Sequence, residues 1–310
     1  MKNYNQITKF KKKRTLINFF FFISVIFLVI SLFYFDKLDL NKIQNIFTLK
    51  SSSILFLLII LKLFFAFLFL NIMQIINNKK IFSLKIISIF LQGGIVSVAV
   101  PGLGLLYKYE KFKNDLNITL AEYTSCQTIN TLLSILSYLL LAILFGFVKI
   151  QKALSLNIYL VITFIFFLII LSLYNYRKKI LYFEKIRNLY SELSTIKKTF
   201  FKNKIKLLII FFSHVVISFL QCYSFYKIIQ FFDFNLDFIT SSYIYISSTI
   251  IDFISIINFV GLFELALSLS ASFAVNNYLD MILVGFSFRI LNIASLLVAT
   301  LITYILNISR

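Results

Sequence analysis

The stretch LQGGIVSVAVPGLG, Leu91–Gly104, contains the only proline of the chain and four of its seven glycines. Proline removes a backbone hydrogen-bond donor and glycine weakens a helix, so this pattern predicts a break inside an otherwise apolar segment. The residues that we assign to this break are Gly93, Gly94, Pro101, Gly102 and Gly104. How the chain runs on either side of it decides the fold.

The composition around this stretch is that of a membrane protein. Hydrophobic residues make up 60% of the 310 residues, charged residues 14%, and the mean hydropathy is +0.92, whereas soluble domains are roughly half apolar. A helix needs about 17–25 apolar residues to cross the hydrocarbon core. Runs of about that length occur at Ile17–Phe35, Ile54–Ile76, Leu120–Phe147, Ile158–Tyr174, Leu207–Phe232 and Met281–Ile308. We predict an all-α, polytopic membrane helical bundle with about eight hydrophobic elements.

The net charge of +19 does not indicate a nucleic-acid partner, because the basic residues come in blocks between the apolar runs. Four blocks hold 22 of the 31 Lys and Arg residues: Lys2–Arg14, Lys79–Lys85, Lys108–Lys113 and Arg177–Lys206. Cytoplasmic loops of membrane proteins carry such an excess of positive charge. We expect all four blocks, and both termini, on the cytoplasmic side of a bacterial-type cytoplasmic membrane.

Two of these blocks flank a single apolar stretch, Ile86–Leu106. One crossing cannot have both ends in the cytoplasm, so the break predicts a re-entrant pair of half-helices. A second stretch, Phe238–Ser272, is too long for one ordinary crossing and is interrupted at Ile257–Gly261, where we place a second break at Gly261. Its flanks are acidic or neutral, so both of its ends should lie outside the cell.

The two halves then contain the same four elements in opposite orientations. We expect a single integral membrane domain over residues 1–310, with halves at about 15–148 and about 155–308. Inverted repeats with broken segments at corresponding positions are typical of transporters with a site near the midplane. The alternative is that both breaks are kinks and each stretch crosses once.

Residues 177–206 carry apolar residues at helical spacing, which predicts a basic cytoplasmic interfacial helix or, alternatively, a solvated loop.

The broken stretches also carry a family resemblance. Pro101-Gly-Leu-Gly104 is followed by Lys108 and by Asn117–Glu122, and Gly261-Leu-Phe-Glu264 is followed by Arg289 in the last apolar run. This order of motifs resembles the lysylphosphatidylglycerol synthase transmembrane-region family over most of the chain. The resemblance implies translocation of a lipid or a lipid-linked sugar.

The sequence departs from the family pattern at three positions. Leu105 stands where an early glutamate is expected, Leu103 where an arginine is common, and Ile257 replaces a proline before the second break. Two-part members of the family add a soluble aminoacyl-transferring domain. We expect none here, because the chain stops at Arg310 directly after its last apolar run.

Charged residues inside apolar runs are costly and are usually kept because they face a cavity or a partner. Glu264 follows the second break and Arg289 lies in the last run. They are expected either to hold a headgroup in the substrate path or to form a structural ion pair. Asp252, about two turns before the second break, is a further candidate for the path. Lys62 is expected to snorkel toward an interface, with a role as a headgroup-phosphate ligand as the alternative. The only histidine, His214, is expected to be a hydrogen-bonded packing residue, with a proton relay as the alternative.

The sequence contains no sign of a metal or cofactor site. Cys126 and Cys222 lie in predicted helices without ligand spacing and are expected to pack as small apolar residues. The clustered acids, bases or metal ligands of an intramembrane enzyme are missing, and so is a phosphate-binding Gly-x-x-x-x-Gly-Lys loop. We expect no catalytic residues, no metal and no cofactor.

The leading hypothesis is a flippase-like carrier that moves a lipid or a lipid-linked molecule across the cytoplasmic membrane. Its partners would be membrane lipids with anionic or lipid-linked headgroups. A small-solute secondary transporter is the alternative, and an intramembrane lipid-modifying enzyme is a weaker one.

Overall fold

The computed structural model describes residues 49–77, 84–99, 103–148, 202–254, 262–272, 274 and 280–308. These residues form eight α-helices, and no strand occurs among them. Outside the described residues lie the predicted run Ile17–Phe35, the run Ile158–Tyr174 and nearly all of the basic segment 177–206. For the described part of the chain, the predicted all-α membrane bundle is confirmed.

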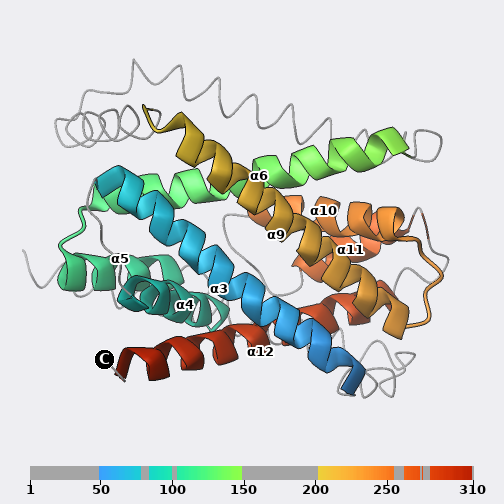
Figure 1. The fold of residues 1–310 in the computed structure, drawn as a ribbon. Helices are drawn as coiled ribbons and strands as arrows, with labels where there is room; N and C mark the ends of the chain where they lie inside the picture. The colour runs from blue at the N-terminus through green and yellow to red at the C-terminus, as the bar shows by residue number, and fades with distance from the viewer. Residues whose placement is uncertain are drawn as a thin grey trace, which may run out of the picture.

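Four of these helices are long and apolar enough to span a membrane. They are α3 (Leu49–Asn77), α6 (Leu120–Val148), α9 (Lys204–Phe231) and α12 (Asp280–Ile308). At about 1.5 Å per residue such a helix reaches about 42 Å, more than the ~30 Å of the hydrocarbon core. Helices of this length fit the bilayer at a tilt, and α3 and α9 run obliquely to α6 and α12 (Figure 1).

The remaining four helices form two hairpins. The first consists of α4 (Leu84–Ala99) and α5 (Leu103–Leu116), and the second of α10 (Phe238–Ile254) and α11 (Leu262–Ala271). The two helices of each hairpin pack against each other, and the hairpins lie toward opposite ends of the bundle (Figure 1). With 14 and 10 residues, α5 and α11 are too short to cross the membrane alone.

The two halves repeat the same order of helix lengths. The first half has helices of 29, 16, 14 and 29 residues, and the second has 28, 17, 10 and 29. The packing follows the same correspondence, because α4 lies against α12 as α10 lies against α6, and α3 against α12 as α9 against α6. Matching helices run in opposite directions in Figure 1. The described helices therefore form the predicted inverted repeat with two broken segments.

The two ends of the bundle differ in charge. The end of α5, the start of α9 and the end of α12 lie together at one end (Figure 1), which carries Lys113, Lys204 and Lys206. Asp233 follows α9 and Asp280 begins α12 at the opposite end. This separation is the one that the positive-inside rule describes. Which end faces the cytoplasm stays a prediction.

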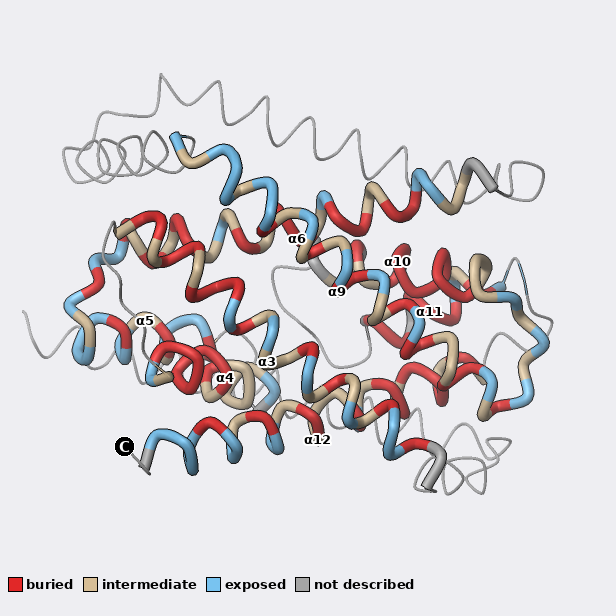
Figure 2. The backbone as a smooth tube through the Cα atoms, in the orientation of Figure 1, coloured by how far each residue is buried: buried red, intermediate tan, exposed pale blue. Residues whose placement is uncertain are grey.

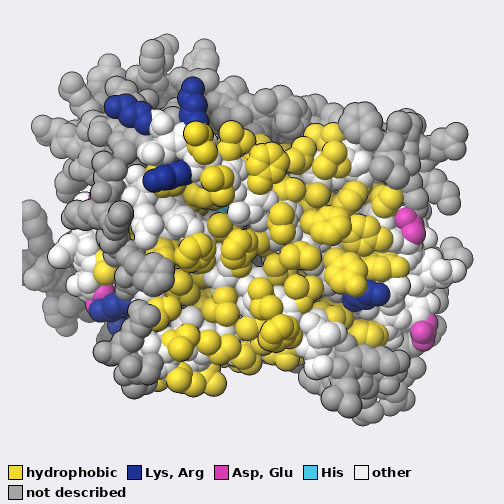
Figure 3. Space-filling model, viewed as in Figure 1, with side chains coloured by type: hydrophobic (Ala, Val, Ile, Leu, Met, Phe, Trp, Pro, Cys, Tyr) yellow, Lys and Arg dark blue, Asp and Glu magenta, His cyan; other side chains and the backbone are white. Residues whose placement is uncertain are grey.

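An apolar face covers the side of the bundle formed by α3 and α9 (Figure 3). Its exposed side chains recur every fourth residue, at Phe56, Ile60 and Phe64 on α3 and at Phe212 and Val216 on α9. Buried positions alternate with these exposed ones along both helices (Figure 2). Such a face suits contact with lipid chains, which are as apolar as these side chains.

The first break differs from the expected one. Gly93 and Gly94 lie inside α4, which continues to Ala99, so they do not interrupt the helix. The interruption falls at residues 100–102, between α4 and α5. The basic block Lys108–Lys113 belongs to α5. The physical reason is that a helix keeps a glycine where a neighbouring helix approaches closely, and both glycines have such neighbours.

Candidate functional site in a cavity between the two halves

A cavity of about 440 Å³ lies between the two halves. Every described helix except α5 contributes to its lining. Apart from two tyrosines, its ionisable and amide side chains are Lys62, His214, Gln221, Asp252, Arg289 and Asn292. Most of the remaining wall is apolar or aromatic. A largely apolar cavity with a few convergent polar groups is the usual form of a ligand-binding site.

Glu264 and Arg289 form an ion pair at this cavity. Arg289 Nε lies 2.7 Å from Glu264 Oε1, and the side chains are 25% and 2% exposed, respectively. Glu264 stands in the first turn of α11, where the positive end of the helix dipole favours a carboxylate. Arg289 lines the cavity, and a guanidinium has five N–H donors. It therefore keeps donors for a ligand after pairing with Glu264.

A glycine on α12 allows this pair to form. A Cβ at Gly285 would lie 2.8 Å from Leu267 Cδ1 and 3.0 Å from Glu264 Cγ. The missing side chain at Gly285 therefore leaves room for the close packing of α11 against α12. Gly285 precedes Arg289 by four residues, so both lie on the same face of α12.

Asp252 and Lys62 bring a second carboxylate and a second cation to the cavity. Asp252 comes from the last turn of α10 and Lys62 from the middle of α3. We expected Lys62 to snorkel toward an interface, and this was wrong, because its side chain lines the cavity. The reason lies in the packing of the helices. Because α3 packs against both α9 and α12, one face of its middle turns points into the bundle.

Both hairpins reach the cavity with the ends of their helices. Ser97 and Val98 come from the last turn of α4, Asp252 from the last turn of α10 and Phe263 from the start of α11. Outside the described residues lie the turns themselves, with Pro101, Gly102 and Gly261. Helix ends leave backbone groups without helical partners, and within a membrane these are tolerated beside protein or a cavity. The described ends of both hairpins therefore border the cavity.

Small residues allow the two helices of the first hairpin to pack closely. A Cβ at Gly104 would overlap the Gly93 carbonyl oxygen and the Ser97 hydroxyl. A Cβ at Gly93 would overlap the methylenes of Lys108. Close approach of two helices through small residues is a common packing mode in membranes. These glycines are therefore packing residues of the α4–α5 interface.

Lys108 is a buried cation of this hairpin, outside the cavity lining. Its stem crosses Gly93, and its Nζ lies 4.2 Å from the centre of the Phe90 ring, a cation–π contact. At the far end of the hairpin, Lys85 Nζ lies 3.5 Å from Asp115 Oδ2. The pairs 85 with 115 and 93 with 108 show that α5 runs back along α4.

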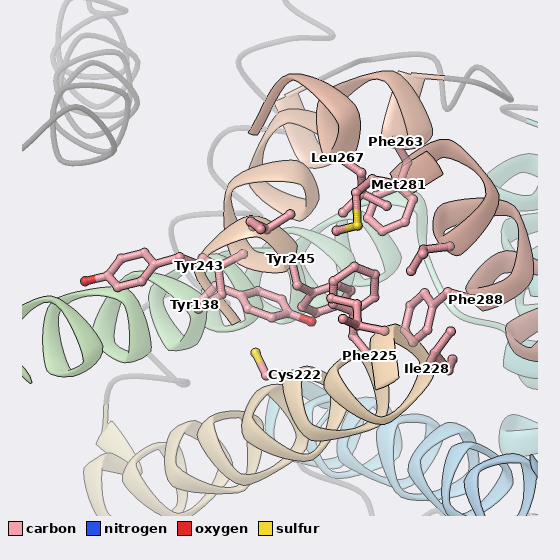
Figure 4. Close-up of a cluster of buried hydrophobic side chains, with 14 of the residues drawn as sticks. Tyr138, Cys222, Phe225, Ile228, Tyr243, Tyr245, Phe263, Leu267, Met281 and Phe288 are labelled. Carbon is pink, nitrogen blue, oxygen red and sulfur yellow. The ribbon is translucent and has the colours of Figure 1, made fainter. Parts of the chain in front are cut away.

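Buried aromatic side chains from both halves form one wall beside the cavity (Figure 4), and Tyr138, Tyr245 and Phe288 also belong to the cavity lining. The ring centre of Tyr245 lies 5.1 Å from that of Phe225, 5.3 Å from that of Phe288 and 6.1 Å from that of Tyr138. Tilted and edge-on contacts of this kind stabilise beyond simple burial. The wall therefore joins α6, α9, α10 and α12 through one group of rings.

The comparison with known families identifies the family of the chain. The family described as the lysylphosphatidylglycerol synthase TM region matches residues 19–278. The chain belongs to this family. No curated protein and no solved structure matched the chain.

Membership in the lysylphosphatidylglycerol synthase transmembrane-region family confirms the resemblance drawn from the motifs. The matched range includes both hairpins, Asp252 and Glu264. It ends before α12, so Arg289 and Gly285 lie beyond the match. The chain is thus a multi-pass membrane protein of a family connected with lipid handling, and its cavity joins matched residues to a helix outside the matched range.

One motif of the family resemblance has a structural explanation. Asn117, with a positive φ of 53°, ends α5. The backbone N–H of Glu122 donates to Thr119 Oγ1 at 3.2 Å, and the N–H of Thr119 donates to Glu122 Oε2 at 2.7 Å. This reciprocal pair is a capping box that starts α6. The spacing Thr-x-x-Glu in the sequence is the signal that predicts this capping box.

His214 is buried and hydrogen-bonded, as expected of a packing residue, but the sequence did not predict that it also lines the cavity. A single histidine in the first half of an apolar helix has no sequence signature of its own, because its role depends on its contacts with α3 and α6. Cys126 and Cys222 are buried and free. Among the described residues, no group of three or more His, Cys, Asp or Glu side chains lies close enough together to hold a metal ion.

Proposed function

We propose that this protein is a flippase-like carrier that moves a lipid or a lipid-linked molecule across the cytoplasmic membrane. The supporting observation is the Glu264–Arg289 pair beside a cavity that both halves and both hairpins enclose. Broken helices that meet between inverted halves form the midplane site of many transporters. The family connects the chain with lipid handling. The proposed partners are membrane lipids with anionic or lipid-linked headgroups.

In this proposal the headgroup enters the cavity while the lipid chains stay in the bilayer. Arg289 and Lys62 offer N–H donors and positive charge to a phosphate. Asp252 offers an acceptor to a positively charged or hydroxyl-bearing part of the headgroup. The two halves then expose the cavity to one leaflet and to the other in turn, by rocking against each other.

We further propose that the end of the bundle with the α4–α5 hairpin faces the cytoplasm, together with both termini. Cysteine at Ser309 should be shielded from an impermeant thiol reagent added to intact cells, and cysteine at Asp233 should react. Cys126 and Cys222 are both buried, so the background should be low. Labelling at position 309 and not at position 233 would show that the protein has the opposite orientation.

The alternatives are a small-solute transporter of the same design and an intramembrane enzyme. Purified protein in liposomes separates the three. The carrier hypothesis expects a fluorescent phospholipid to change leaflets, small solutes to stay entrapped, and the lipid to remain chemically unchanged. Solute loss without lipid movement would favour the solute transporter, and a modified lipid would favour the enzyme.

The decisive variants are Glu264→Gln and Arg289→Gln. Each should lower lipid translocation by at least about tenfold, the effect of losing one charge-assisted hydrogen bond, while membrane insertion stays near wild type. Lys227→Gln is the matched control, because Lys227 is a cation near the end of α9, bonded to Gln230 and absent from the cavity lining. If the charge-swapped double variant regains full translocation, the pair is structural and the site assignment fails.

A further inference from the structure

The surroundings of His214 are not explained by the Glu264–Arg289 ion pair. It is the only histidine of the chain, 1% exposed, and it lines the cavity. Its Nδ1 lies 3.2 Å from Ser134 Oγ on α6. Its ring stands edge-on to Phe65 of α3, with centres 5.4 Å apart and planes at 90°. Contacts from two helices therefore fix the orientation of the imidazole.

The tautomer of His214 depends on the direction in which the Ser134 hydroxyl points. Ser134 Oγ donates its hydrogen to the Asn130 carbonyl oxygen, at 3.0 Å. A hydroxyl has one hydrogen, so toward His214 it accepts. Nδ1 of His214 is then the N–H donor, and Nε2 of the neutral ring has a free lone pair.

Nε2 is the ring nitrogen that a ligand would have to satisfy. Within the described part of the chain, the buried His214 Nε2 has no hydrogen-bond partner. A buried acceptor without a donor is destabilising, and such atoms in native structures call for an explanation. Here a cavity occupant that brings a donor would satisfy it.

The ionisable groups around His214 come from every helix that packs against α9 and lines the cavity. They are Lys62 on α3, Tyr138 on α6, Tyr245 and Asp252 on α10 and Arg289 on α12. Lys62 and Arg289 are donors suited to a phosphate, whereas Asp252 is an acceptor. His214 Nε2 adds a further acceptor, so the cavity is equipped for a headgroup with both an anionic part and a donor part.

On the basis of the proposed function, we propose that His214 Nε2 accepts a hydrogen bond from the headgroup of the transported lipid. The cargo is then a phospholipid whose headgroup carries an N–H or O–H donor beside its phosphate. Ammonium and hydroxyl headgroups share this chemistry, whereas a trimethylammonium headgroup lacks it. His214 would be a specificity-determining residue, and Ser134 the positioning residue that holds its tautomer.

A single histidine allows a direct test on the wild-type protein. Ring-¹⁵N-histidine labelling reports one residue, and nitrogen shifts distinguish the two neutral tautomers and the cation. The protein is placed in bilayer discs of phosphatidylcholine alone, or with phosphatidylglycerol or phosphatidylethanolamine added. In phosphatidylcholine alone we expect the Nδ1–H tautomer. Adding a lipid with a donor headgroup should change the Nε2 chemical shift. A response to phosphatidylglycerol indicates a hydroxyl donor, and a response to phosphatidylethanolamine indicates an ammonium donor. An Nε2–H tautomer, an imidazolium, or identical spectra in all three bilayers would overturn the inference.

Two substitutions test the same bond through selectivity. His214→Asn keeps an amide donor near Ser134 but removes the Nε2 acceptor, and His214→Gln places an amide oxygen near the Nε2 position. The translocation ratio of donor lipids to phosphatidylcholine should fall about five- to tenfold in His214→Asn, the ratio that one ordinary hydrogen bond supplies, and recover in part in His214→Gln. An unchanged ratio in a folded His214→Asn protein contradicts the inference.

The two experiments separate this inference from the proposed function. A spectral response to donor lipids without any translocation leaves the His214 site standing and contradicts the carrier. Translocation with no spectral response and no change in selectivity supports the carrier and overturns the His214 site.

Discussion

The two hairpins occupy corresponding places in the two halves but use different chemistry. In the first hairpin, Gly93, Ser97 and Gly104 bring α4 and α5 together, and the buried Lys108 lies over a ring outside the cavity lining. In the second, α10 and α11 carry Asp252 and Glu264 to the cavity and to its ion pair. An inverted repeat can therefore keep its topology while one copy specialises in close packing and the other in charge.

The largest expected effect is the loss of the charge partner in the second hairpin. Arg289→Leu leaves the Glu264 carboxylate, which is 2% exposed, without its counter-ion. Removing one member of a buried pair costs about 3–5 kcal/mol of unfolding free energy. Glu264→Leu should cost less, because the remaining Arg289 is 25% exposed and is partly solvated. Thermal unfolding in detergent measures both, and equal losses would argue against this asymmetry.

The packing of the first hairpin should respond to added volume at one glycine more than at another. Gly104→Ala places a methyl group against the Gly93 backbone, which cannot move aside, and should cost about 1–3 kcal/mol. Gly94→Ala is the control, because its nearest neighbour is the end of the Leu296 side chain at 3.1 Å. It should cost less than about 1 kcal/mol, since a side-chain end can shift. Unfolding midpoints in the same detergent compare the two, and a larger loss for Gly94→Ala would contradict the packing analysis.

Two lysines, the buried Lys108 and the cavity-lining Lys62, allow a further test of this comparison. Lys108→Met keeps an unbranched stem over Gly93 and should change stability by less than about 1 kcal/mol, while Lys108→Ala should cost about 2 kcal/mol through lost packing. Lipid translocation should stay near wild type in Lys108→Met. Lys62→Met removes a cation that lines the cavity, so translocation should fall. Similar translocation rates for the two Met variants would mean that the cavity cation is dispensable.

The smallest expected effect concerns the connection from the first hairpin to α6. Thr119→Ala removes the hydroxyl that accepts from the Glu122 N–H and should cost about 1 kcal/mol, as other N-cap substitutions do. Thr119→Ser keeps the hydroxyl and should stay near wild type. Both are compared by thermal unfolding, with translocation assayed in parallel. If Thr119→Ser loses as much stability as Thr119→Ala, the loss comes from the methyl group and not from the capping hydrogen bond.

Parts of the site could be predicted because their signals are local. Glu264 and Arg289 are charges in apolar runs, where a partner or a cavity is needed, and the structure brings the two together. The roles of Gly93, Gly94, Lys62 and His214 were not predictable in the same way. Each depends on which face of its helix meets another helix, and that face is set by packing between segments far apart in the chain.

The sequence alone determined the class of the protein, the long spans and the existence of two broken segments. These follow from the length of the apolar runs and from the blocks of basic charge, which are properties of neighbouring residues. Only the tertiary structure decided that the ends of both hairpins border one cavity, that glycines of α4 serve its packing against α5 and α12, and that His214 faces the cavity with one nitrogen held by Ser134. The physical reason is that helix rotation and helix contact are settled jointly by all the packed surfaces, so no single segment contains that information.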